Sequence, residues 1–262
     1  MTLAPHDYDD LQKAVDLLEK KRFAARLTHY AGQPVEKMIT TLPRRISERV
    51  HRVVRTTVTR LLTIAVKTLN SRRRPDASLR FHRVAGGLSG ALGGAFGLPA
   101  LAVELPLSTA LMLRSIADIA RSEGEDIATV ESRLACLEVF ALGGRGATAS
   151  DADTGYYAVR ASLAKALSET AQHIARKGLA EKGAPVLVRF ITQIASRFGV
   201  LVSEKVAAQA IPVLGAAGGA SINLLFLNHF QETARGHFIV RRLERIYGPE
   251  VVQAAYRELS RI

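Results

Sequence analysis

The chain has 262 residues, 48% of them hydrophobic, which is enough apolar sequence for a buried core and excludes global disorder. Its one cysteine, Cys136, excludes an intrachain disulfide and a metal site built from cysteines alone. The formal net charge of +12 is uneven, because residues 1–83 hold 18 Lys and Arg against 8 Asp and Glu. We therefore expect the first third of the chain to contact an anionic partner, such as phospholipid or nucleic acid.

The N-terminal region is predicted to form two helices. The first ten residues are polar and acidic, and they lack the basic start and apolar segment of a secretory signal. A first amphipathic helix is predicted from about Asp9 to Tyr30, where a glycine and a proline follow. A longer second helix is predicted from about Pro43 to Asn70.

This second helix has one apolar and one basic side when it is laid out at 100° per residue. The apolar side consists of Ile46, Val50, Val53, Val54, Val58, Leu61, Ile64 and Leu69. The basic side consists of Arg44, Arg45, Arg49, Arg52, Arg55, Arg60 and Lys67. We expect this side to bind anionic lipid, with Arg45, Arg49, Arg52 and Arg60 as contacts, because cations gain about 1 kcal/mol each near such a surface.

The basic side of this helix has two other possible interpretations, a solvated face and a nucleic-acid contact. The basic side is also compatible with a solvated face on a helix that packs in the core. Nucleic acid is disfavoured as the partner, because the sequence has no known binding motif and few aromatic residues for base stacking.

Two glycine-rich apolar runs, 84–113 and 206–228, stand out from the rest of the chain. The first is interrupted by a single charge, Glu104, and the second has none. Glycines four residues apart allow close helix packing, which is compatible with a buried hairpin, a hairpin that dips into a membrane, or two spanning helices. Low helix propensity and a proline in each run, Pro99 and Pro212, disfavour a simple crossing. We expect the two runs to pack on each other.

The remainder of the chain is predicted to be helical, because no long stretch alternates with period two. Helices are expected at about 108–122, 129–142, 156–177, 185–208 and 222–247, before a short terminal helix, with a linker at 145–155. The fold class is therefore all-α, a multi-helix bundle with two glycine-rich apolar helical hairpins. A basic amphipathic region over 1–80 is predicted to pack on a main helical domain over 81–262.

Several polar residues in apolar surroundings are candidates for a functional site. Burying Glu104 without a partner would be costly, so it requires Arg114, another base or a raised pKa. His237, Arg241 and Glu244 follow at i, i+4 and i+7 and share one helical face. His229 lies eight residues before His237, about 80° around the helix, which is a poor arrangement for binding one metal.

Three interpretations of these residues remain open. They form a structural polar network; or Glu104, His229, His237 and Glu244 form a metal-dependent or peptidase-like hydrolytic site; or Arg114 and Arg241 bind a lipid headgroup or another ligand. The sequence contains none of the HExxH, GxSxG or Walker A motifs. We therefore predict no metal site and no cofactor, and the sequence indicates no particular reaction.

Three ordered segments carry a family resemblance. They read ELPLSTALMLRSIADIARSEGED at 104–126, RLACLEVFALGG at 133–144 and QAIPVLGAAGGASINLLFLNHFQETARGHFIVRRLERIYG at 209–248. Together they resemble the EcsC family over residues 80–262. The resemblance implies a bacterial, mainly helical, membrane-associated protein and implies no established reaction.

We expect a non-enzymatic accessory protein that is cytoplasmic and peripheral to the inner membrane. An anionic membrane surface is the expected partner, together with a membrane protein. A hydrolase with a helix-built site around Glu104, His229 and His237 is the alternative function. The sequence sets no oligomeric state.

Overall fold

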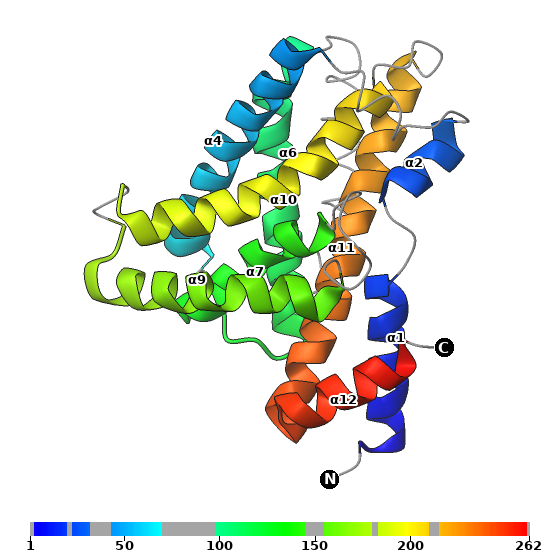
Figure 1. The fold of residues 1–262 in the computed structure, drawn as a ribbon, viewed down its shortest axis with the longest axis vertical. Coiled ribbons are helices and arrows are strands. Elements are labelled where there is room, and N and C mark those ends of the chain that lie inside the picture. The colour runs from blue at the N-terminus through cyan, green and yellow to red at the C-terminus, as the bar shows by residue number, and fades with distance from the viewer. Residues whose placement is uncertain are drawn as a thin grey trace.

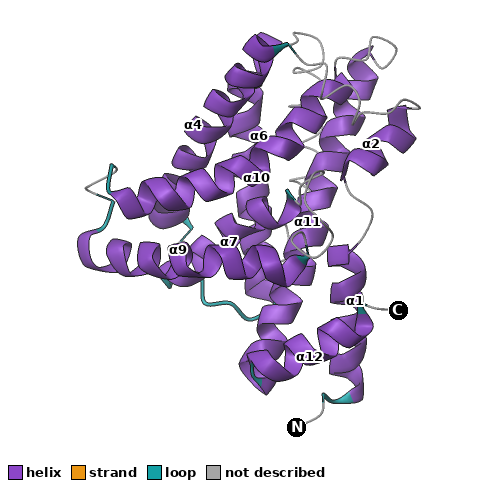
Figure 2. Ribbon diagram, viewed as in Figure 1, coloured by secondary structure: helices purple, strands orange, loops and turns teal. Residues whose placement is uncertain are grey.

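The structure, a computed structural model, describes residues 3–19, 23–31, 43–69, 98–144, 155–179, 183–209 and 215–260. These residues are helical apart from short connections, and no strand is present among them (Figure 2). The described helices are α1 (Pro5–Glu19), α2 (Phe23–Ala31), α4 (Arg44–Thr68), α6 (Leu98–Ser122), α7 (Val130–Gly143), α9 (Tyr156–Lys177), α10 (Pro185–Gln209), α11 (Gly215–Tyr247) and α12 (Pro249–Leu259). The predicted all-α fold is confirmed.

Some predicted features lie outside these described residues. Part of each glycine-rich run lies outside them, because residues 84–97 and 210–214 are not among the described ranges. The predicted linker at 145–155 also lies outside the described ranges, except for Gly155. The helix predicted from Asp9 to Tyr30 is described as two helices, α1 and α2, with residues 20–22 outside the description.

The centre of the bundle is α7, in which twelve of fourteen residues are buried. A helix that is apolar nearly all round is expected to be enclosed by other helices, and α4, α6, α9, α10 and α11 all pack against it. The long helix α11 extends from the upper to the lower end of the molecule in Figure 1 and packs along α1 and α6. The core is therefore built around α7 and α11.

Helices from both sides of the predicted boundary at residue 80 are in contact. The N-terminal helix α1 packs along α11, and α4 packs against α10, α6 and α7. The boundary itself stays a prediction. Two glycines confirm the predicted ends of helices, since Gly124 follows α6 with φ 77° and Gly248 follows α11 with φ 88°, a region that favours glycine.

Helix α6 begins at Leu98, ten residues before its predicted start. The predicted start at residue 108 comes just after Pro106, which cannot donate a backbone hydrogen bond within a helix. In the structure Pro106 lies inside α6, and the hydroxyl of Thr109 donates to the carbonyl oxygen of Leu105 at 2.6 Å. The helix therefore continues through the proline.

The starts of α4, α6 and α11 and the end of α10 lie together at the upper end of the molecule in Figure 1. The lower end contains α12, the end of α11 and the start of α1. Among the described helices, α10 is long and apolar enough to cross a membrane, and half of its most apolar stretch is buried in the protein. A core helix also meets this test, and α10 packs against α4, α7 and α9.

Candidate functional site

Glu104 is paired with a base that the sequence did not single out. Nζ of Lys205 on α10 lies 2.6 Å from Oε1 of Glu104 on α6 and donates to Oδ1 of Asn223 on α11 at 2.8 Å. Lys205 is fully buried, and Glu104 is buried as well. Burial lowers the pKa of Lys205, while the Glu104 carboxylate opposes that shift. The pair therefore links three helices and supplies the "other base" among the three predicted solutions for Glu104.

His237 belongs to a second buried cluster of polar side chains. Its Nδ1 is hydrogen-bonded to the hydroxyl of Tyr156 at 2.9 Å, and its Nε2 lies 3.8 Å from Oε2 of Glu138. His237 is fully buried, which lowers its pKa well below the usual value and keeps the ring neutral. Burial raises the pKa of Glu138 to about 7. These three side chains come from α11, α9 and α7.

Glu244 extends this cluster through an arginine. Arg160 donates two hydrogen bonds to Glu244, at 2.7 and 2.6 Å, in a bidentate arrangement. Arg160 also donates to the hydroxyl of Tyr156 at 3.4 Å. We call Glu138, Tyr156, Arg160, His237 and Glu244 the Tyr156 network. It joins α7, α9 and α11 through polar contacts in the interior.

Arg241 is neutralised by a carboxylate from the connection between α6 and α7. It donates to Glu125 at 2.8 and 3.2 Å, and Arg245 contacts the same carboxylate. Burial alone would raise the pKa of Glu125, but hydrogen bonds from Arg241 and Ser132 together with the charges of Arg241 and Arg245 lower it. Arg114 has a different environment, because it is exposed on α6. The two predicted ligand-binding arginines therefore differ in exposure and in charge balance.

The four residues predicted for a hydrolytic site have separate partners. Nε2 of His229 donates to the carbonyl oxygen of Gly143 at 3.0 Å, whereas His237, Glu244 and Glu104 have the partners described above. In the described part of the chain, no three His, Cys, Asp or Glu side chains are arranged to hold a metal ion. The structure does not bring these four residues to one shared partner.

Helix α4 buries one side and exposes its cations. Val50, Val54, Val58 and Leu61 are at most 1% exposed. All seven Arg and Lys residues of the helix are exposed. Arg44 pairs with Glu48 at 3.0 Å, and the other six make no ion pair with any residue in the described ranges. The predicted lipid-contacting arginines are therefore accessible and lack a neutralising partner there.

The comparison with known protein families decides which family this sequence represents. The sequence model of the EcsC protein family matches residues 8–243. The chain belongs to the EcsC family. The match includes α4 and every residue of the Tyr156 network except Glu244, and it extends further toward the N-terminus than the segments that carried the resemblance. Neither the search of curated proteins nor that of solved structures gave a match.

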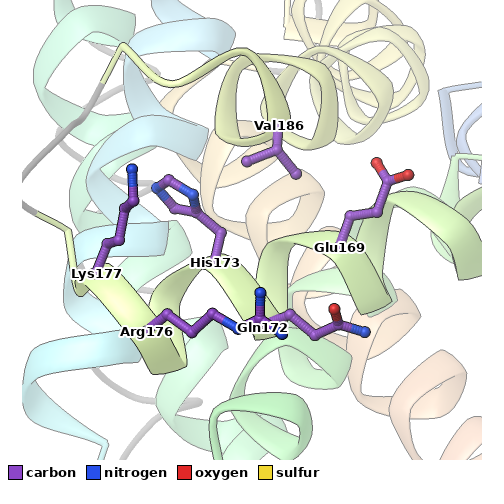
Figure 3. A pocket seen from close by; sticks show the side chains of 6 residues that line it. All are labelled: Glu169, Gln172, His173, Arg176, Lys177 and Val186. Carbon is purple, nitrogen blue, oxygen red and sulfur yellow. The ribbon is translucent and has the colours of Figure 1, made fainter.

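This EcsC-family protein also has a surface hollow of about 340 Å³ between α9 and α10 (Figure 3). It is lined by Glu169, Gln172, His173, Arg176, Lys177 and Val186. Arg176 and Lys177 lie in the last turn of α9, where cations complement the partial negative charge of the helix end. Glu169 pairs with Arg189 at 3.2 Å beside them. The hollow is therefore lined by both acidic and basic side chains. Its two cations are explained by their position at the C-terminal end of α9.

Sequence reasoning missed Lys205, Glu138, Tyr156 and Arg160 in this EcsC-family chain. Lys205 and Glu138 each interrupt an apolar stretch of a helix, as Glu104 does, and that signal was available. Tyr156 and Arg160 gave no such signal, because they lie at the start of a helix with many polar residues. Their role becomes visible only in the folded structure, where they contact His237 and Glu244 of α11.

Proposed function

We propose that this EcsC-family protein is a peripheral, non-enzymatic accessory protein that binds an anionic membrane surface through the basic side of α4. The observation that carries the proposal is the set of exposed cations on α4 without a neutralising partner in the described ranges. An inner cytoplasmic membrane surface, with a membrane protein as further partner, is the expected place of action.

The position of the charges supports binding rather than a purely structural role. Arg44 and Arg45 occupy the first turn of α4, which holds no acidic residue and has no side-chain N-cap. Cations at a helix N-terminus oppose the helix dipole, so they do not stabilise the helix there. Arg45, Arg49, Arg52 and Arg60 fall within about 80° of one another around the helix. They form one stripe that a flat anionic surface can contact.

The opposite side of α4 is held by the protein core, so the helix does not need to leave the bundle to bind. Arg133 on α7 donates to the carbonyl oxygen of Val66 at 2.6 Å, and Arg121 on α6 donates to that of Leu69 at 3.0 Å. Both contacts satisfy carbonyl groups at the C-terminal end of α4. Binding through α4 is therefore electrostatic and is expected to weaken at high salt.

Charge reversal on α4 tests the proposal. Arg45, Arg49 and Arg52 are changed to Glu together, and flotation with vesicles containing phosphatidylglycerol is compared with the unchanged protein. The matched control reverses three exposed cations elsewhere, Arg176, Lys177 and Arg257, which gives the same change in net charge. We expect loss of flotation only for the α4 variant. Equal flotation of both variants would contradict the proposal.

A hydrolase with a helix-built site is the second candidate, and His237 favours it. Nε2 of His237 has no hydrogen-bond partner among the described residues, although Glu138 lies 3.8 Å away. The ring is fully buried, so a substrate would reach it only if the helices that cover it moved. Metal analysis of the purified protein and of a variant with His229→Ala and His237→Ala tests this alternative. A bound metal that the variant loses would favour it.

A further inference from the structure

Helix α6 exposes large apolar side chains close to its start. Val103 is 73% exposed and Leu107 is 55% exposed, and the two lie one helical turn apart. Ala102 beside them is also exposed. Single exposed apolar residues are common on soluble proteins, but adjacent ones on a single stripe mark a contact surface more often.

The inner side of the same turn is firmly fixed. Glu104 is bound to Lys205, and Leu105 is fully buried. Because successive helical residues are rotated by about 100°, Val103 and Leu107 cannot turn inward while these two residues face the core. The exposed apolar pair is therefore held outward by a buried ion pair beneath it.

The apolar pair lies at the end of the molecule where the basic helix starts. Helices α4 and α6 pack against each other, and both begin at the upper end in Figure 1. At 1.5 Å per residue, Val103 and Leu107 are about 8 and 14 Å from the first residue of α6. Arg49 and Arg52 are about 8 and 12 Å from the first residue of α4. The apolar pair and these cations therefore lie at similar heights along two helices that pack against each other.

The exposed stripe of α6 changes from apolar to basic along its length. Arg114 follows Leu107 by seven residues, which is two turns or about 10 Å, and it is exposed on the same stripe. Helices at a membrane interface bury apolar groups about 5–10 Å deep and keep Lys or Arg at headgroup level. The order of residues on α6 matches that arrangement.

We propose that Val103 and Leu107 insert into the headgroup–acyl boundary of an anionic bilayer while the basic stripe of α4 lies on its headgroups, so that the side of the molecule that exposes both faces the membrane. This inference rests on the proposed function and adds the orientation and an apolar contribution to it. A lipid surface is the expected partner because, among the described residues, the cations of α4 other than Arg44 have no ion-pair partner and the exposed positions of the α6 stripe include no acidic residue.

Site-specific labelling tests the insertion directly. An environment-sensitive fluorophore is attached to Leu107→Cys, with Ile246→Cys as control, because Ile246 has the same 55% exposure but lies near the end of α11 at the opposite end of the molecule. The native Cys136 is buried and its thiol pKa is raised to about 12, so it does not compete for label. Vesicles contain phosphatidylcholine with or without phosphatidylglycerol.

We expect a blue shift and quenching by lipid-borne quenchers at position 107, and neither at position 246, when phosphatidylglycerol vesicles are added. A neutral substitution pair, Val103→Thr with Leu107→Gln, should weaken partitioning about tenfold, whereas Ile246→Gln should leave it unchanged. Thermal unfolding of both variants checks that the fold is retained, since all three positions are exposed.

The outcomes separate the two proposals. Vesicle-bound protein without a spectral shift at position 107 would overturn the insertion and leave the α4 proposal intact. A shift at position 107 that is equally strong with neutral vesicles would support insertion and contradict the electrostatic role of α4. Absence of flotation with every vesicle would overturn both.

Discussion

Lys205 and Glu104 show how an apolar glycine-rich region can contain charge. Glu104, Lys205 and Asn223 come from three different helices, and Lys205 and Glu104 are 101 residues apart in the chain. The sequence indicated that Glu104 required a partner, because an unpaired buried carboxylate is costly. It could not identify Lys205, since the choice among Arg114, Lys205 and a raised pKa depends on how α6 and α10 pack.

Removing one member of this pair should be more harmful than removing both. Lys205→Met leaves Glu104 buried without a countercharge and is expected to lower the free energy of unfolding by about 3–5 kcal/mol. Adding Glu104→Gln to this variant should recover a large part of that loss, because the uncompensated charge is gone. Urea unfolding of the two single variants and the double variant measures the coupling. Additive losses would contradict a direct ion pair.

Glu138 should make stability depend on pH. Its pKa is raised from 4.5 to about 7, so between these values the folded protein binds a proton that the unfolded chain releases. Stability from this group is complete below pH 4.5 and is lost as the pH rises through 7, by up to about 3 kcal/mol. Glu138→Gln should therefore gain stability relative to the unchanged protein from pH 5 to pH 8. Chemical unfolding at several pH values measures this difference, and a constant difference would contradict the assignment.

At the level of helices, hydrophobic periodicity predicted most elements within a few residues. The basic helix, predicted from Pro43 to Asn70, is α4 at Arg44–Thr68, and the helix predicted over 156–177 is α9. The start of α6 was missed because Pro106 is normally a signal for a helix boundary. The face shared by His237, Arg241 and Glu244 was recognised, but each residue has a different partner, on α9 or in the α6–α7 connection. Spacing within one helix does not reveal which helix packs against it.

The contact between α1 and α11 depends on Gly236. A Cβ atom there would lie 2.6 Å from Cγ of Leu18 and 3.1 Å from the carbonyl oxygen of Ala14. Gly236→Ala gains up to about 1 kcal/mol of helix propensity, yet overpacking costs about 1–3 kcal/mol, so we expect net destabilisation. Gly183→Ala is the control, because nothing lies within 4 Å of its added Cβ. Thermal unfolding should show a lower midpoint for Gly236→Ala alone, and an unchanged midpoint would contradict the close packing.

The whole molecule combines an interior in which buried charges are paired with a surface that exposes cations and apolar side chains. The Tyr156 network and the Glu104–Lys205 pair satisfy buried charge inside the bundle, which explains most of the polar residues that the sequence marked as candidates. The exposed cations of α4 and the exposed apolar pair on α6 have no such role in the described structure. Membership of the EcsC family does not identify a reaction. The functional proposal therefore rests on these two exposed surfaces.

The most direct test of that proposal is the partitioning of the unchanged protein onto vesicles as the phosphatidylglycerol fraction is raised. Clustered cations contribute about 1 kcal/mol each near an anionic surface, so the partition coefficient should rise steeply with that fraction and fall as salt is added. We predict little binding to pure phosphatidylcholine. Equal binding to neutral and anionic vesicles, or binding to neither, would contradict the account.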